Sequence, residues 1–324
     1  MNEVITKKRQ RPKLGIYMKP RDVKVMNTLS SYHLLRESSL HALCFPTVRE
    51  QRNVQYKLKR LADHSYIGRR FPPIVHRDNT DFVDYAHQDR REAIYFLGPE
   101  GAGFLRQDYN PEVAQVKLGY LYHRLDIADI RACLELALRK EEDVELIRWI
   151  NENDKDEDGE FILHDQVTIK DPETDKPRRL SFRPDACFIL EERVTGKQVL
   201  FFVEVDEGTE SGQRRFRDKV LAYRTFQEKK FLERFDFAGE GFRVLTICRS
   251  ERGKEQAKRK ANLVNVTQEA AGRRQFWFAT FDQVMPEDRV TGAHILHSPI
   301  WKRAYAELKE PEITLSKHLF GLDR

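Results

Sequence analysis

The stretch "RPDACFILEERVTGKQVLFFVEVDEG", residues 183–208, contains two apolar runs separated by a charged segment. Runs of this length, rich in Phe, Val, Ile and Leu, predict two buried strands, at 182–190 and 198–206. Asp185 begins the first strand directly after Pro184. Glu204 interrupts the second, where an unpaired charge would be costly. The stretch therefore predicts a sheet with two acids placed within it.

The elements around this stretch predict the fold class. An apolar run at 161–169 precedes it, and a helical pattern follows it. A strand, a helix at 252–271 and another strand come next. Three strands, helix, strand, helix, strand is the order of an α/β domain whose sheet opens with a three-stranded meander. A helix beginning near Asp126 should link domains or pack on this sheet. We therefore predict a mixed α/β (α+β) chain whose sheet is flanked by helices.

The acids of the second strand share one face. Alternation along "FFVEVD" points Glu204 and Asp206 to one side, toward Asp185 if the two strands pair. Carboxylate oxygens and water are the ligands that Mg²⁺ and Mn²⁺ prefer, and a bound ion would activate water for attack on a phosphodiester. We therefore predict a metal-binding acid cluster of Asp185, Glu204 and Asp206. The alternative is a structural role, with the acids paired to Arg183 or Arg215.

Composition limits the classes of protein that fit. The chain has 324 residues, 34% of them charged, and a mean hydropathy of −0.67, which predicts two domains and a soluble protein. No stretch approaches the ~18–20 apolar residues of a membrane span. The basic N-terminus leads into no apolar region, so we expect no secretory signal. Four widely separated cysteines indicate reduced core thiols in a cytoplasmic protein.

Positive charge is concentrated near the N-terminus. Residues 1–80 contain 17 Lys/Arg and 6 Asp/Glu, whereas the whole chain carries only +5. This asymmetry indicates a basic part that faces a polyanion, with a solvated basic surface as the alternative.

The segment "TVREQRNVQYKLKRLADHSYIGRR", residues 47–70, predicts an amphipathic helix with an apolar stripe of Val54, Leu58 and Leu61. Two shorter helical patterns precede it, and two strand-like runs follow it around a long turn. This order predicts a winged helix-turn-helix that inserts its third helix into the major groove. A small helical domain with a charged exterior is the alternative. The candidate DNA-binding residues lie opposite the stripe, namely Arg49, Arg52, Tyr56, Lys59 and Arg60.

The acidic segment "NENDKDEDGE", residues 151–160, has the spacing of a calcium-binding loop. We expect a helix before it, over "VELIRWI". The sequence after it alternates as a strand, and its twelfth position is Asp where Glu is usual. We therefore expect a solvated connection that does not bind calcium. The matching positions are Asp154, Asp156, Asp158, Gly159 and Asp165.

Several segments together resemble the replication-relaxation family of plasmids and mobile elements. They are "YFLGPEGAGFL", "YHRLDIADIRACLELA", "RPDACFIL" and "FFVEVDEGTES" with the helix carrying "KVLAY". The resemblance runs from about residue 22 to about residue 250. It implies an N-terminal winged helix-turn-helix and a C-terminal domain similar to the PD-(D/E)XK nuclease fold. It also implies a role in replication or mobilisation of extrachromosomal DNA.

The nuclease pattern maps onto four residues of this sequence. Asp185 after Pro184 matches the PD, and Glu204 matches the (D/E). Asp206 stands where a lysine would normally orient water and stabilise charge on the phosphate. Lys219, in the following helix one turn before Tyr223, is the candidate for a displaced lysine, and it is also a candidate ion-pair partner of the acids.

His123 in "YHRLDIAD" is the other residue carried by the resemblance. A single histidine before an amphipathic helix is more often a cap or a core hydrogen-bonding residue than a catalyst, and we keep it as a secondary candidate.

We expect a flexible basic arm at 1–20, a winged-helix domain at 21–110, a nuclease-like domain at 111–290 and a C-terminal extension at 291–324. The predicted function is that of a DNA-binding accessory protein in plasmid or mobile-element replication or mobilisation. Its predicted partners are duplex DNA and replication or relaxase proteins of the same element. The alternatives are an endonuclease that uses Mg²⁺ or Mn²⁺ and a transcription regulator with a sensing C-terminal domain.

Overall fold

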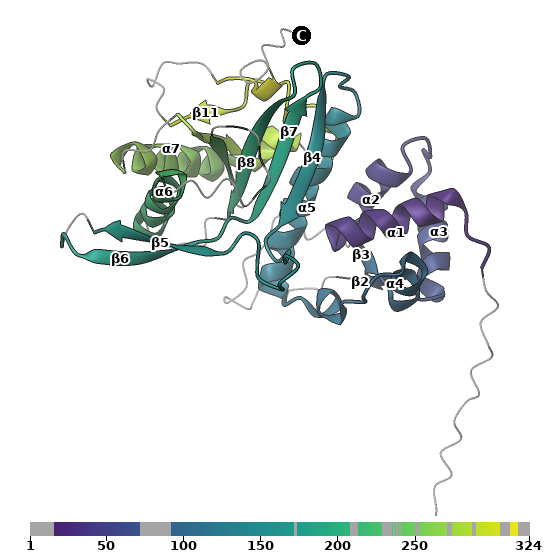
Figure 1. The fold of residues 1–324 in the computed structure, drawn as a ribbon. Coiled ribbons are helices and arrows are strands. Elements are labelled where there is room, and N and C mark those ends of the chain that lie inside the picture. Colours follow the sequence, from purple (N-terminus) through teal and green to yellow (C-terminus); the bar gives the residue numbers. More distant parts are fainter. Residues whose placement is uncertain are drawn as a thin grey trace, which may run out of the picture. The chain divides into compact units, whose positions relative to one another are not determined.

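The structure is a computed structural model (Figure 1). The described residues are 16–71, 92–171, 174–207, 213–228, 235, 237, 239, 241–249, 253–270, 274–286, 290–304 and 312–316. The chain divides into two compact units. The N-terminal unit comprises Met1–Pro72 and Glu92–Val116, and the C-terminal unit comprises Pro73–Arg91 and Lys117–Arg324.

The N-terminal unit contains the three predicted helices and the two predicted strands. The helices are α1 (Pro20–Tyr32), α2 (Glu37–Cys44), α3 (Gln51–Asp63), α4 (Pro99–Leu105) and the 3₁₀ helix η1 (Pro111–Gln115). The strands β1 (Leu34–Arg36), β2 (Ile67–Arg70) and β3 (Ile94–Leu97) form an antiparallel sheet in the order β1-β3-β2. The short β1 was not predicted. The predicted arm up to residue 15 and the turn between β2 and β3 lie outside the described residues.

Helix α3 packs as its sequence pattern predicts. Val54, Leu58 and Leu61 are fully buried, so the helix is anchored by one apolar stripe. Gly98 and Gly101 permit the close approach of β3 and α4 to the end of α3. A Cβ atom at Gly98 would lie 2.2 Å from the carbonyl oxygen of Ser65, which no side chain would tolerate. The "GPEGAG" segment is therefore a packing feature.

The C-terminal unit contains a mixed six-stranded sheet in the order β11-β10-β9-β8-β7-β4 (Figure 1). Strand β7 is antiparallel to β4 and β8, whereas β8, β9 and β10 are parallel. The strands are β4 (Val144–Asn151), β7 (Ala186–Glu192), β8 (Lys197–Asp206), β9 (Phe242–Cys248), β10 (Phe276–Thr280) and β11 (Lys302–Arg303). The helices of this unit are α5 (Leu118–Leu138), α6 (Gln213–Glu228), α7 (Gly253–Glu269) and α8 (Phe281–Val284). The predicted mixed α/β fold class is confirmed.

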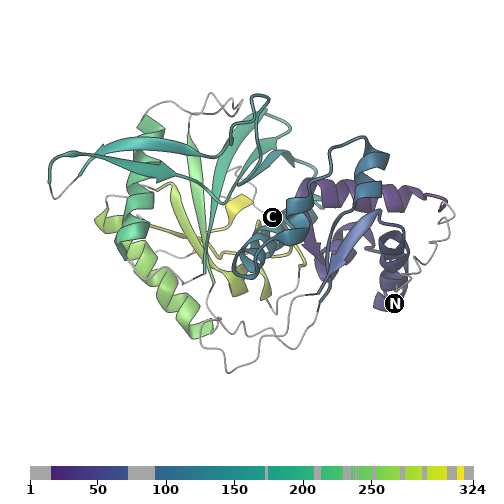
Figure 2. The same ribbon diagram turned by 90° about the horizontal axis from the view of Figure 1, so that it is seen from below.

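Two cores cover the two faces of this sheet. Phe201, Val203 and Val205 of β8 belong to the core shared with α5 and α8. The alternate residues Leu200 and Phe202 belong to the core shared with α6 and α7. Figures 1 and 2 show α6 and α7 on one side of the strands and α5 on the other. Burial on both faces explains the nearly continuous apolar run of β8.

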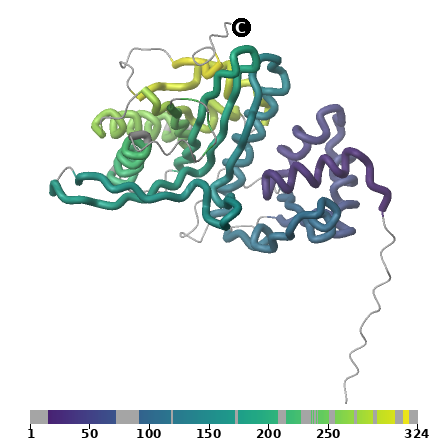
Figure 3. The backbone as a smooth tube through the Cα atoms, viewed as in Figure 1, coloured from purple at the N-terminus to yellow at the C-terminus, as the bar shows by residue number. Residues whose placement is uncertain are grey.

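Two expectations about the start of this domain are wrong. The segment "VELIRWI" is not a helix, because it forms β4 and pairs with β7 around an irregularity at Leu146 and Arg148. The run at 161–169 does not join the main sheet. Among the described residues, strands β5 (Asp165–Lys170) and β6 (Pro177–Phe182) pair with each other and with no other strand, and the tube in Figure 3 shows them extending as a ribbon. None of the helices in the described part of the chain is long and apolar enough to cross a bilayer.

Candidate functional site

The exposed side of α3 carries three of the five predicted DNA-binding residues, and a fourth lies just before the helix. Arg52, Tyr56 and Lys59 are exposed on the helix, and Arg49 is exposed just before it. Tyr56 is 73% exposed, so its ring and hydroxyl are open to a partner. Lys59 contacts Asp63 at 2.5 Å along the helix, an exposed i,i+4 pair that holds it weakly.

Arg60 does not belong to this open surface. Its guanidinium donates to the carboxylate of Asp22, which is buried in α1. The same carboxylate accepts from the backbone N–H of Lys19 at 3.0 Å. Arg60 therefore joins α3 to α1, and its contact with DNA stays a prediction. A helical wheel separates the two sides of a helix but cannot show which basic residue meets a buried acid on another element.

The register of β7 and β8 brings the first two predicted acids together. Ala186 pairs with Val203 in an antiparallel ladder, so Asp185 and Glu204 are neighbours across the strands. One oxygen of Asp185, Oδ2, accepts the backbone N–H of Val205 at 2.7 Å. The other, Oδ1, lies 3.1 Å from His123 Nε2. His123 comes from α5, and its Nδ1 lies 3.3 Å from Glu207.

Glu204 is bound from the other face of the sheet. Its Oε2 accepts from Lys219 Nζ at 2.7 Å, and its Oε1 accepts from the Tyr223 hydroxyl at 2.6 Å. Both partners lie on α6, one turn apart, as the sequence predicts. Glu204 is only 3% exposed. Each oxygen of the two acids therefore has a protein partner.

Burial and these partners set the protonation of the site. Burial raises the pKa of Glu204 to about 7, with Lys219 opposing the rise and Asp185 adding to it. Burial alone would also raise the pKa of Asp185, but the charge and hydrogen bond of His123 hold it below its ordinary value. Burial opposes the charged form of His123, yet Asp185 and Glu207 raise its pKa to about 10. The site thus holds an ionised Asp185 paired with a cationic His123.

Asp206 has a different partner from the other two acids. Its carboxylate accepts two hydrogen bonds from Arg259 of α7, from Nε at 2.6 Å and Nη2 at 2.9 Å. The predicted cluster of three acids is therefore a pair, Asp185 and Glu204, plus a separate Asp206–Arg259 ion pair. Residues two apart share a strand face, but along this face Glu204 meets α6 and Asp206 meets α7.

A cavity of about 390 Å³ opens beside the acid pair. Sequence reasoning missed Tyr120, Glu152 and Asn153, which no motif or spacing singles out. Arg183, predicted as an alternative partner of the acids, contacts Glu152 instead, at 2.8 Å. The residues that line the cavity are Tyr120, Glu152, Asn153, Ser181, Phe182, Arg183, Asp185, Glu204, Lys219, Ala222 and Tyr223.

The arrangement does not fit a divalent ion. Hard cations such as Mg²⁺ need several open oxygen ligands, but the oxygens of Asp185 and Glu204 face His123, a backbone N–H, Lys219 and Tyr223. Asp206, the third expected ligand, faces Arg259. Within the described ranges, no group of three or more His, Cys, Asp or Glu is placed to hold a metal ion.

The acidic loop uses its carboxylates to close its own turns. Asp156 Oδ1 accepts the backbone N–H groups of Asp158 and Glu160, at 3.1 and 2.9 Å. Asp154 Oδ2 accepts the backbone N–H of Asn151 at 2.8 Å. Asp165 begins β5, so a strand follows the loop as predicted. That the loop binds no calcium stays a prediction.

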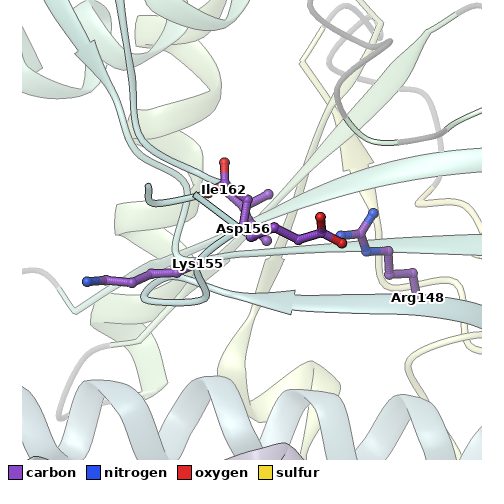
Figure 4. A pocket seen from close by; sticks show the side chains of 5 residues that line it. Arg148, Lys155, Asp156 and Ile162 are labelled. Carbon is purple, nitrogen blue, oxygen red and sulfur yellow. The ribbon is translucent and has the colours of Figure 1, made fainter. Parts of the chain in front are cut away.

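A second hollow, of about 470 Å³, adjoins this loop and is lined by Arg148, Lys155, Asp156, Glu157 and Ile162. Figure 4 shows the Lys155 side chain pointing away from Arg148. Arg148 donates to the carbonyl oxygen of Phe235 at 3.4 Å. Lys155 and Arg148 therefore do not point to one ligand position in this hollow, and the cavity at the acid pair is the stronger candidate site.

Comparison with known proteins gives one match. The family model described as replication-relaxation matches residues 26–236, more than half of the chain. The matched range includes α3 and the acid pair with its partners His123, Lys219 and Tyr223. No curated protein and no solved structure matches the chain.

Proposed function

The chain belongs to the replication-relaxation family, and on that premise we propose that it binds duplex DNA as an accessory protein of plasmid or mobile-element replication or mobilisation. Family membership suggests the role in replication. The observation that carries the DNA-binding part is the surface of α3, where Arg52, Tyr56 and Lys59 are exposed on a helix anchored by its opposite side.

The shape of this surface suits a major groove, which admits one α-helix. Arg52 offers a planar fork that matches the acceptor edge of guanine, and Tyr56 offers an aromatic face with a hydroxyl. Strands β2 and β3 follow α3 and supply the hairpin of the proposed winged helix. Arg69 is exposed on β2, with its guanidinium 5.3 Å from the centroid of the Phe71 ring, and is a candidate contact to the DNA backbone.

The positive charge near the N-terminus also favours duplex DNA as the partner. The excess of Lys and Arg in the first 80 residues would release counterions from DNA on binding, so the affinity should fall steeply with salt. Replication or relaxase proteins of the same element are the protein partners that we propose.

Substitution of α3 tests this function. Arg52→Ala/Tyr56→Ala should weaken binding to a specific duplex by about 1–3 kcal/mol for each base that the helix no longer reads. The fold should be preserved, because both side chains are exposed. Lys24→Ala, which removes an exposed cation from α1 of the same unit, is the matched control. Fluorescence anisotropy at several salt concentrations measures the effect. Wild-type affinity of the double variant at every salt concentration would exclude α3 as the reading helix.

A second candidate function is an endonuclease that uses Mg²⁺ or Mn²⁺, targeted by the N-terminal unit. The observation in its favour is that Asp185, Glu204 and Lys219 line one cavity, with the lysine supplied by α6 in place of position 206. The occupied carboxylate oxygens argue against it. Supercoiled plasmid incubated with the protein and either ion, beside the Asp185→Ala variant, distinguishes the two functions. Nicking or linearisation that depends on both Asp185 and the ion would establish the nuclease.

A further inference from the structure

We infer that the cavity beside Asp185 and Glu204 binds one nucleotide of an unpaired DNA strand, with the base against Tyr120 and the backbone phosphate against Arg183 and Arg215. The inference rests on the proposed function only in taking DNA as the ligand. It adds a second site, in the C-terminal unit, for a different form of DNA from the duplex assigned to α3.

The size of the cavity suits a single unpaired nucleotide. Its volume of about 390 Å³ lies in the range of ~300–1,000 Å³ that is typical of small-molecule sites. A base within an intact duplex is stacked and paired, so it reaches a concave site only when it is unpaired or turned out of the helix. A continuous duplex therefore does not fill this cavity.

Tyr120 provides the face on which a base can stack. It lies on α5, lines the cavity and is 37% exposed. Its ring lies 5.9 Å from the ring of His123, which Asp185 and Glu207 hold in place. The tyrosine is thus backed by a fixed group while part of its surface is open. Stacking on an aromatic ring accepts any base.

Two arginines offer donors to a phosphate. Arg183 contacts Glu152 through Nε, so the two terminal nitrogens of its planar fork can serve another acceptor, and its side chain is 47% exposed. Arg215 is exposed and has no ion pair within the described part of the chain. It precedes Lys219, which lines the cavity, by one turn of α6, although Arg215 itself is not among the lining residues.

The three acids that line the cavity do not oppose such a ligand, and the first of them, Glu152, is paired with Arg183. Asp185 is paired with the cationic His123, and Glu204 is bonded to Lys219 and Tyr223, so their charges are compensated within the protein. Asn153 and Ser181 also line the cavity. An amide and a hydroxyl each both donate and accept hydrogen bonds, as the edge of a base requires.

Binding of a labelled single-stranded oligothymidylate to the full chain, measured by fluorescence anisotropy, tests the stacking. Tyr120→Leu should weaken binding roughly 5- to 150-fold, the range for removal of one stacked base. Tyr120→Phe should bind as the wild type does. Tyr109→Leu, at a similarly exposed tyrosine of the N-terminal unit, is the matched control. Equal affinities of the Tyr120→Leu variant and the wild type would overturn the inference.

Salt dependence tests the phosphate contact. Arg215→Ala should reduce the slope of log K against log[salt] for the single strand by about 0.7. Arg214→Ala, at the neighbouring exposed arginine that precedes Asp218 by one turn, should leave the slope unchanged. An equal change in both variants would indicate a general effect of charge and refute the site.

Duplex and single-stranded probes separate the two proposals. Loss of duplex binding in Arg52→Ala/Tyr56→Ala with single-strand binding retained, and the reverse in Tyr120→Leu, would support both. A wild-type protein that binds duplex but not single-stranded DNA would overturn the inference and leave the proposed function intact. A protein that binds the single strand through Tyr120 but no duplex would overturn the proposed duplex binding and leave this inference intact.

Discussion

Replacement of Glu204 by glutamine should stabilise the C-terminal unit at alkaline pH. Burial, opposed by Lys219 and reinforced by Asp185, raises the pKa of this carboxyl from 4.5 to about 7. Each tenfold change in proton affinity corresponds to about 1.4 kcal/mol, so ionised Glu204 costs on the order of 3 kcal/mol above pH 7. The pKa of about 7 already includes the attraction of Lys219. Glutamine keeps an oxygen for the Tyr223 hydroxyl but turns an amide NH₂ group toward Lys219 in place of an acceptor, so we expect a net gain of about 1–2 kcal/mol.

The sign of the pH dependence follows from the raised pKa. Below pH 4.5 the carboxyl is protonated in both the folded and the unfolded chain, and its ionisation costs nothing. As pH rises from 4.5 through 7, the unfolded chain releases the proton first, and the folded state loses stability relative to it. The advantage of Glu204→Gln should therefore be small at pH 5 and reach its full size at pH 8.

Urea unfolding followed by tryptophan fluorescence measures this difference for the C-terminal unit alone. The three tryptophans of the chain, Trp149, Trp277 and Trp301, all belong to that unit. Glu145→Gln is the control, since Glu145 is an exposed partner of Arg193, and it should change the free energy of unfolding by less than about 0.5 kcal/mol. A Glu204→Gln variant that is less stable than the wild type at pH 8, or equally affected at pH 5 and pH 8, would refute the reasoning.

The remaining predictions concern the same cavity and the acidic loop. Lys219→Ala should destabilise the C-terminal unit by about 2–3 kcal/mol at pH 8. This is less than the ~3–5 kcal/mol expected for a fully buried pair, because the Lys219 side chain is 36% exposed. The destabilisation should be smaller at pH 5, and an unchanged urea midpoint at pH 8 would contradict the prediction. Saturating Mg²⁺ or Mn²⁺ should leave the melting temperature unchanged, because the acid oxygens are occupied, whereas a saturable rise that follows RT ln(1 + [L]/Kd) and disappears in Asp185→Asn would show a metal site. Millimolar Ca²⁺ should also leave it unchanged, and a stabilisation that is absent in Asp154→Asn/Asp156→Asn would refute that prediction.

Local patterns predicted the features that depend on neighbouring residues. The apolar stripe of α3 follows from a period of 3.6 residues, and the proximity of Asp185 and Glu204 follows from two strands joined by a short turn. Helical spacing likewise placed Lys219 and Tyr223 one turn apart on one face of α6, and both reach Glu204. In each case the residues in contact are no more than 19 positions apart in the chain.

Long-range contacts could not be predicted in this way. Asp206 meets Arg259, 53 positions away, and Arg60 meets Asp22, 38 positions away; no periodicity connects them. The segment "VELIRWI" has apolar positions compatible with either period, and its pairing with β7 decides for a strand. The sequence did contain one indication that β5 lies outside the main sheet. Polar and apolar residues alternate along β5, as in a strand with one face in solvent, whereas β8 is apolar almost throughout.

The acid pair also joins the sheet to the helices on both of its faces. Asp185 is held by His123 from α5, and Glu204 is held by Lys219 and Tyr223 from α6, so helices on opposite faces of the sheet are tied to adjacent strands at one point. A chain that lost the partners His123 and Lys219 would leave the buried acids unpaired and loosen both layers, whether or not it ever cut a phosphodiester. The motif can therefore be retained for its structural role in a protein that has no nuclease activity. Its presence indicates how the helices are joined to the sheet and does not by itself establish a nuclease.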